Sequence, residues 1–150
     1  MTAKEFLLQY KQAVLYVERL TKEYCAQLEL IDDINSPLGG DGTPGGGSIS
    51  RTTENKAMRL IDKTTELKEA KEEAIRIRQE VVDMVNRIQN EKGDILYERY
   101  INLIRDQKTG RLRKKTWEEV GEAVGYSERQ ARNLHDEALN DVQHFLLFPF

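Results

Sequence analysis

The stretch KTWEEVGEAVGYSERQARNLHDEAL, Lys115–Leu139, decides the fold of the C-terminal part of this chain. Thr116 is followed three residues later by Glu119, and Ser127 is followed three residues later by Gln130. In such a capping box the hydroxyl and the later side chain each accept a hydrogen bond from the other residue's backbone amide, so the pair marks a helix start. The two pairs predict helices that begin at residues 117 and 128.

The apolar residues of this stretch are spaced as in two short helices with buried faces. The positions expected to be buried are Trp117, Val120 and Val124 in the first helix and Ala131, Leu134 and Ala138 in the second. Gly125 is expected to end the first helix, because a left-handed backbone there favours glycine. The second helix is expected to continue through Val142. Two short helices joined by a tight glycine turn form a helix-turn-helix unit, whose second helix can enter the major groove of DNA.

Five polar residues are left on the outward side of the second helix: Glu128, Arg129, Arg132, Asn133 and Asp136. An arginine can donate two hydrogen bonds to guanine, an asparagine can pair with adenine, and a glutamate can accept from cytosine. These side chains are therefore the candidates for reading base edges or contacting phosphates.

A basic segment lies immediately before the helix pair. Residues 105–115 carry one acid, Asp106, and a local balance of +5, from Arg105, Lys108, Arg111, Arg113, Lys114 and Lys115. The whole chain, by contrast, has a formal net charge of -3, so any nucleic-acid signal is local. The segment is either a solvated loop without a partner or a site that binds DNA phosphates. Its place beside the helix pair favours phosphate contacts, with Arg111, Arg113, Lys114, Lys115 and Thr116 as DNA-binding candidates.

The N-terminal part predicts a long antiparallel helical hairpin, a coiled coil, over residues 1–92. Its first helix should span residues 3–34, with a heptad seam of Phe6, Tyr10, Ala13, Val17, Leu20, Tyr24, Ile31 and Ile34. Its second should span residues 53–90, with Leu60, Leu67, Ala70, Ala74, Ile77, Val81, Met84 and Ile88, and Lys63 as an interruption. The glycine-rich residues 35–51 are expected to be a loop between them.

The predicted fold class is therefore all-α, a hairpin at 1–92 followed by a helix-turn-helix domain at 93–150. Gly93 is expected to break the second helix, and Asp94 to cap a third helix over residues 94–106. The apolar C-terminus FLLFPF, Phe145–Phe150, either folds back over the helices or docks on polymerase or another protomer.

The helix pair resembles region four of bacterial sigma factors, over TWEEVGEAVGYSERQARNLHDEAL without a gap, and ILYERYI resembles the helix that precedes that region. The connecting NLIRDQKTGRLRKK is longer than the usual link. The layout as a whole is similar to phage-encoded sigma-like regulators of the autolysin-regulator and RinA type. The resemblance implies that Arg132 contacts phosphate and that Ser127, Glu128, Arg129 and Asn133 touch DNA. Glu128 stands where sigma factors usually have arginine, which implies a different promoter sequence.

An enzyme is not expected, because no Ser/His/Asp set or distinct carboxylate pair stands out in the sequence. His135 and His144 are nine residues apart, which is not a metal spacing on one helix face, so neither a metal nor a cofactor is expected. His135 is expected on the helix surface or near a phosphate, and Cys25 is expected to be a buried thiol. No signal peptide or apolar run of membrane length is present, which predicts a protein of the bacterial host cytoplasm.

The sequence thus predicts a sequence-specific, DNA-binding regulator of phage or prophage transcription. An activator is favoured over a full sigma factor, because the sigma regions that bind core polymerase and melt DNA are absent. The expected partners are double-stranded DNA, a second copy of the chain bound through residues 1–92, and host RNA polymerase. Two alternatives stay open. One is a DNA-packaging factor similar to phage small terminase subunits, and the other is a helical adaptor that binds protein.

Overall fold

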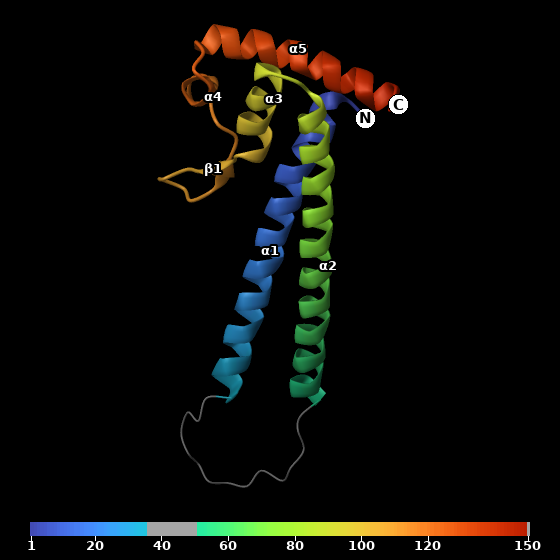
Figure 1. Ribbon diagram of the computed structural model, residues 1–150. Coiled ribbons are helices and arrows are strands. Elements are labelled where there is room, and N and C mark those ends of the chain that lie inside the picture. The colour runs from blue at the N-terminus through green and yellow to red at the C-terminus, as the bar shows by residue number, and fades with distance from the viewer. Residues whose placement is uncertain (36–50, 150) are drawn as a thin grey trace, which may run out of the picture. The chain divides into compact units, whose positions relative to one another are not determined.

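The structure, a computed structural model, describes residues 1–35 and 51–149, without the side chains of residues 31–35 and 51–53. The glycine-rich loop predicted at 35–51 lies almost wholly outside the described residues. The elements are α1 (Ala3–Asn35), α2 (Arg51–Arg87), α3 (Glu91–Leu96), the π-helix η1 (Tyr97–Ile101), β1 (Ile104–Arg105), β2 (Leu112–Arg113), α4 (Trp117–Val124) and α5 (Glu128–Leu147) (Figure 1). The described chain is mostly helical, which confirms the all-α class.

The contacts divide the chain into two compact units. The larger unit consists of Met1–Leu15 together with Glu73–Phe150, and the smaller unit is Tyr16–Glu72. Each long helix therefore contributes to both units. The boundary predicted at residue 92 separates a hairpin from a domain that folds by itself. It is a different kind of division from these contact-based units, and it stays a prediction.

The smaller unit is two helical segments packed on part of the predicted seam. Leu20, Leu67 and Ala70 are buried, with Val17 and Tyr24 packed against them. The small side chain of Ala70 suits a close approach of the two helices, because a larger residue there would hold the backbones apart.

The polar interruption of the seam is an ion-pair site. The Lys63 Nζ atom lies 2.9 Å from Glu23 Oε2 and 3.4 Å from Glu66 Oε2. Cys25, in contrast, is exposed, so the prediction of a buried thiol is wrong. It follows Tyr24, whose side chain takes the apolar seam position, and so it lies off the packed face.

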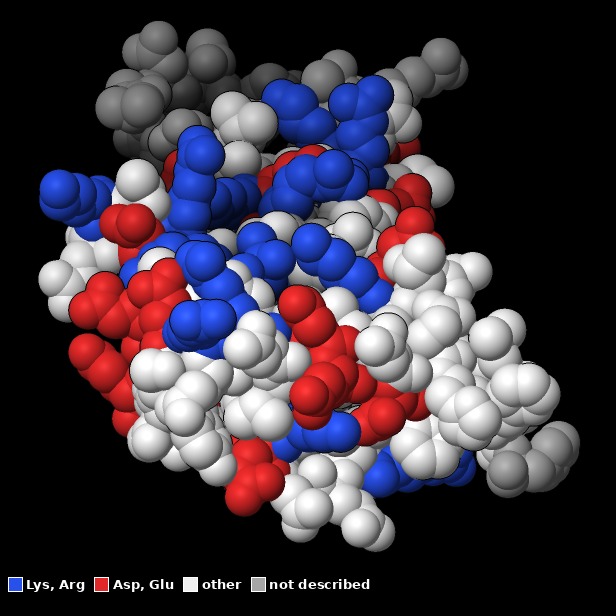
Figure 2. Space-filling model, turned by 90° about the horizontal axis from the view of Figure 1, so that it is seen from above, with Lys and Arg blue, Asp and Glu red and all other residues white. Residues whose placement is uncertain are grey.

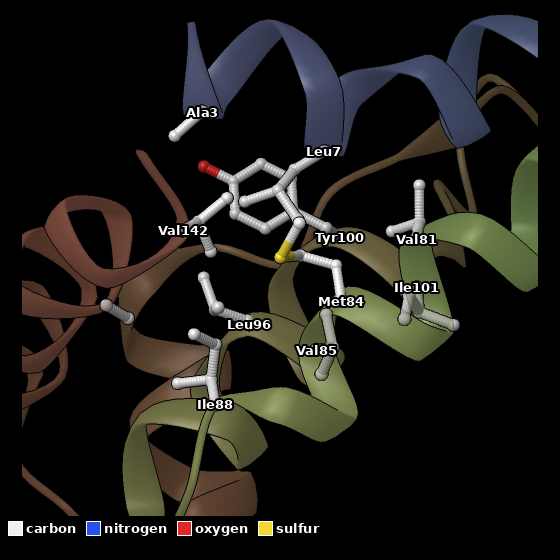
Figure 3. Close-up of a cluster of buried hydrophobic side chains, with 11 residues drawn as sticks. Ala3, Leu7, Val81, Met84, Val85, Ile88, Leu96, Tyr100, Ile101 and Val142 are labelled. Atoms are coloured by element: carbon white, nitrogen blue, oxygen red, sulfur yellow. The ribbon is translucent and has the colours of Figure 1, made fainter. Parts of the chain in front are cut away.

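The larger unit has its main core where the start of α1, the end of α2, α3, η1 and α5 meet. The buried members of this core are Ala3, Leu7, Val81, Met84, Val85, Ile88, Leu96, Tyr100, Ile101, Ala138 and Val142 (Figure 3). Figure 3 shows the Tyr100 ring among Ala3, Leu7 and Val142. The backbone amide of Ala3 donates to Gln143 Oε1 at 2.9 Å, which also fixes the start of α1 to α5.

The junction between α2 and α3 differs from the prediction. The helix ends at Arg87, and the turn is made by Asn90, which has a φ of 66°. Gly93 does not break a helix and Asp94 does not cap one, because both lie inside α3. A Cβ atom on Gly93 would lie 2.4 Å from the carbonyl oxygen of Ile88, so glycine is needed there for close backbone contact. The sequence reveals a glycine but not whether its role is to turn the chain or to make room.

The third helix also ends earlier than predicted, at Ile101 rather than at residue 106. A short antiparallel ribbon follows, in which Ile104 pairs with Arg113 and Arg105 pairs with Leu112. Asp106 closes its turn, because its Oδ1 atom accepts from the Lys108 amide at 2.8 Å and its carbonyl accepts from the Gly110 amide at 2.8 Å. The basic segment is therefore a folded hairpin in the structure rather than an open loop.

The C-terminal apolar segment is divided between the core and the surface. Helix α5 continues through it to Leu147, and Phe145 and Leu146 pack against the main core of the larger unit. Leu147 and Phe148 are exposed. The segment therefore does not fold back but continues α5, and only its first part covers the core.

Candidate nucleic-acid interface

Both predicted capping boxes are present, so α4 and α5 begin at residues 117 and 128 as predicted. The Thr116 hydroxyl accepts from the Glu119 amide at 3.2 Å, and Glu119 Oε1 accepts from the Thr116 amide at 3.0 Å. The Ser127 hydroxyl accepts from the Gln130 amide at 3.2 Å, and Gln130 Oε1 accepts from the Ser127 amide at 3.1 Å. Thr116 and Ser127, predicted DNA contacts, therefore act as helix caps here.

The turn between the two helices depends on two glycines. Gly125 has a φ of 80°, the left-handed conformation predicted for it. The amides of Gly125 and Tyr126 both donate to the carbonyl oxygen of Gly121, each at 2.8 Å. A Cβ atom on Gly121 would lie 2.5 Å from the Tyr126 carbonyl oxygen. Gly121, which the sequence analysis did not single out, thus allows the turn to fold against α4 and fixes where α5 starts.

A small core supports the first half of α5 from behind. Ile95 of α3, Val120 of α4 and Ala131 of α5 are fully buried together. Trp117, Val124 and Leu134 pack against them, so the apolar positions predicted for the helix pair form this core, except Ala138, which lies in the main core. Two elements, α3 and α4, therefore hold the start of α5 in place, which gives this surface the rigidity that binding needs.

His135 is part of this support and not of the surface, so the prediction that it is exposed is wrong. Its Nε2 atom lies 2.7 Å from the Tyr100 hydroxyl, and its ring meets the edge of the Trp117 ring at 4.6 Å between centroids. Burial lowers the pKa of His135 to about 4 and raises the pKa of Tyr100 to about 12. The Asp136 carboxylate lies 3.5 Å from Nδ1 and favours the imidazole proton on that nitrogen. In this tautomer Nε2 accepts the hydrogen bond from the Tyr100 hydroxyl.

The outward side of α5 carries the five polar residues that the sequence predicted, and all five are exposed: Glu128, Arg129, Arg132, Asn133 and Asp136. One ion pair occurs among them, with Arg132 Nη2 at 2.6 Å from Glu128 Oε1 and about half of each side chain exposed. An exposed pair at this spacing contributes only about 0.3–0.5 kcal/mol, so Arg132 can exchange Glu128 for a phosphate at little cost.

The cations of the basic segment are not equivalent. Arg113 Nη1 lies 2.8 Å from Glu119 Oε1, and this hydrogen bond contributes most to lowering the pKa of Glu119 to about 2. Lys115 is paired with Glu98 and is largely covered. Arg113 and Lys115 thus bind the ribbon to α4 and η1, whereas Arg111 is exposed. The number of cations in the sequence does not show which of them form ion pairs within the protein.

Three further cations belong to this region although the sequence analysis did not select them: Lys4, Lys11 and Arg99. The Arg99 guanidinium lies 4.3 Å from the centroid of the Trp117 ring, and its Nη1 donates to the Lys115 carbonyl. Lys4 and Lys11 of α1 act electrostatically on Lys114. Figure 2 looks down on the side that carries α5 and shows Lys and Arg side chains gathered beside a group of acidic ones. No signal in the local sequence connects α1 with this region.

No family model, curated protein or solved structure matches this chain. Within residues 1–35 and 51–149, no helix is long and apolar enough to cross a membrane. No group of His, Cys, Asp and Glu in the described part of the chain could hold a metal ion. The functional argument therefore depends on the geometry of α4, α5 and the cations around them.

Proposed function

We propose that this protein is a sequence-specific DNA-binding regulator of transcription, in which α4 and α5 form a helix-turn-helix unit. The observation that carries the proposal is the polar, exposed face at the start of α5, held by a buried support of α3, η1 and α4. The B-DNA major groove is about 12 Å wide and admits one helix, and a recognition helix contacts base edges with its N-terminal residues.

Each exposed residue of this face has a proposed role. Arg129 and Asn133 read bases, because no interaction within the described part of the chain engages their side chains, which can form paired hydrogen bonds with guanine and adenine. Arg132 binds a backbone phosphate. The Glu128 carboxylate repels nearby phosphates, and it can accept a hydrogen bond from cytosine. Arg111, exposed on the ribbon, adds affinity that does not depend on sequence.

The biological setting follows from the resemblance of Thr116–Leu139 to region four of sigma factors. By that resemblance the protein activates phage or prophage genes, and host RNA polymerase is a second partner. The capped helices and the glycine turn are compatible with this reading, since they give the resembling residues the local structure that such a unit requires.

A dimer through residues 1–92 is the proposed assembly, because one helix pair has a small footprint and two would read two half-sites. The smaller unit exposes Leu30, Met58 and Ile61, which gives it apolar surface for a second copy. Sedimentation equilibrium should give the mass of a dimer. A ring of eight or more chains would instead favour the DNA-packaging alternative.

Arg132→Ala should weaken binding to duplex DNA about tenfold, because a hydrogen-bonded ion pair with phosphate is lost and Glu128 is left unpaired beside the backbone. The salt dependence of log K should become less steep by about 0.9. The measurement is fluorescence anisotropy with a duplex selected from a random pool by the wild-type protein. Arg132→Lys keeps the charge and should retain most of the affinity, and Arg78→Ala, at an exposed position of α2, should retain all of it.

The selection itself separates the proposal from its rivals. A recovered consensus that Asn133→Ala or Arg129→Ala alters would support base reading by α5. Unchanged affinity of Arg132→Ala would show that the wrong face has been assigned to the groove. If the wild-type protein retains no duplex at low or moderate salt, the protein-binding adaptor becomes the better reading.

A further inference from the structure

Lys114 occupies an unusual position for a lysine. Its side chain is half-buried, with Nζ 5.9 Å from the centroid of the Tyr100 ring. Burial lowers the pKa of Lys114, and the charged groups Arg99, Lys4 and Lys11, all cations, lower it further. Among the described residues, no carboxylate is within ion-pair distance of Lys114.

The fold of the larger unit brings these cations together from distant parts of the sequence. Ala3 and Leu7 are buried in the same core as Tyr100 and Val142, as Figure 3 shows. This packing places the first turns of α1 beside η1 and α5. Lys4 and Lys11 are seven residues apart on α1, which puts them on one side of the helix two turns apart.

Two acids that neighbour Lys4 and Arg99 in the sequence have partners of their own. The Glu5 carboxylate accepts from the Thr2 amide at 2.8 Å at the start of α1. The Glu98 carboxylate is paired with Lys115. Like charges held together without an acid repel one another, so the folded chain carries an electrostatic cost that an anion would relieve.

We propose that Lys4, Lys11 and Lys114 form a phosphate-binding surface, the cation cluster, through which the start of α1 grips the DNA backbone. This inference rests on the proposed function and adds to it a contact from the N-terminal helix. Arg99 connects the cluster to the recognition surface, because it acts electrostatically on Lys114 and is itself influenced by Arg132. Duplex DNA fits better than a small anion, since its phosphates repeat along the backbone and the cations are spread over two turns of α1 and the end of the ribbon.

The test compares the full chain carrying Lys4→Ala and Lys11→Ala with the wild-type protein, in duplex-binding titrations over a range of salt. The double variant should lose about tenfold in affinity, and the slope of log K against log salt should become less steep by about 1.8, or 0.9 for each lost phosphate contact. The loss should be equal for the selected duplex and for a random one, because backbone contacts carry no sequence information.

Lys22→Ala with Lys71→Ala is the matched control, since it removes the same charge from exposed positions elsewhere on α1 and α2. This control should follow the wild-type salt dependence. Lys4→Arg with Lys11→Arg should restore binding. Circular dichroism melts of all variants would show that the affinity changes do not come from unfolding.

Three outcomes would overturn the inference, and they differ in what else they overturn. If the double variant and its control behave alike while Arg132→Ala weakens binding, the cation cluster is not a DNA contact but the proposed function stands. If the double variant loses the binding of inorganic phosphate but keeps the duplex affinity of the wild-type protein, the surface serves a small anion and the proposed function stands. If the wild-type protein binds no duplex, the proposed function fails, and this inference fails with it.

Discussion

Leu7→Ala should lower the free energy of unfolding of the larger unit by about 2–5 kcal/mol, the cost of leaving a cavity at a fully buried leucine. Leu7 is completely buried, and its neighbours come from the end of α2, from η1 and from α5. Few of these neighbours can relax into the space, because each also packs against the others (Figure 3). Urea unfolding followed by circular dichroism measures the change.

Leu15→Ala is the matched control on the same helix. Leu15 is 39% exposed, so its truncation removes less buried surface and leaves no closed cavity. It should cost less than about 1 kcal/mol. Equal losses for the two variants would mean that the first turns of α1 do not pack against η1 and α5 in solution.

Leu7 also shows how far the sequence could predict the fold. The heptad pattern identified one face of α1, and its members Phe6 and Tyr10 do pack against the main core. Leu7 lies beside that seam and was not selected, because the pattern assumed one partner helix. In the structure the start of α1 has partners on more than one side. Only the tertiary arrangement shows this, since the elements that cover Leu7 are distant in the sequence.

Acidification from pH 6.5 to pH 4 should destabilise the protein by up to about 3 kcal/mol through His135 alone. Burial lowers the pKa of this side chain from 6.5 to about 4, with Asp136 opposing the shift. Between these values the unfolded chain holds a proton on the imidazole and the folded chain does not. Lower pH therefore favours the unfolded chain, and the stabilisation is complete only above pH 6.5.

The free energy of unfolding, measured in urea at several pH values across this window, tests the effect. His135→Gln removes the titrating group and should give a flatter profile, while His144→Gln, at an exposed histidine of the same helix, should follow the wild-type curve. Glu119, whose pKa Arg113 lowers from 4.5 to about 2, also loses stabilisation at the acid end of this window, because the unfolded chain begins to bind its proton there. His135→Gln keeps Glu119, so the difference between the two profiles isolates the imidazole. A wild-type profile as flat as that of His135→Gln would show that the imidazole is not held neutral.

The sequence predicted those features of the candidate site that depend on residues close together in the chain. The capping boxes located both helix starts, and helical spacing separated the buried residues from the five exposed polar ones. His135 was misplaced although it is four residues after Ala131, a spacing typical of the buried face, because a histidine was taken for a surface residue. No sequence pattern near Lys4 or Lys11 indicated that these two lysines lie close to Lys114. Which cations are paired and which are free depends on the ribbon, and a charge count contains no information about it.

The division of the larger unit between the two ends of the chain has a consequence for biosynthesis. Its core joins Leu7 to Val142, so nearly the whole chain must leave the ribosome before this core can close. Contacts of such high sequence separation also slow folding, because a long loop must be ordered before they form. The start of α1 therefore stays unpacked through most of translation, until α5 has been synthesised. A chain that stalls before α5 is complete would expose Leu7 and the other apolar residues of this core, which is a surface that chaperones recognise.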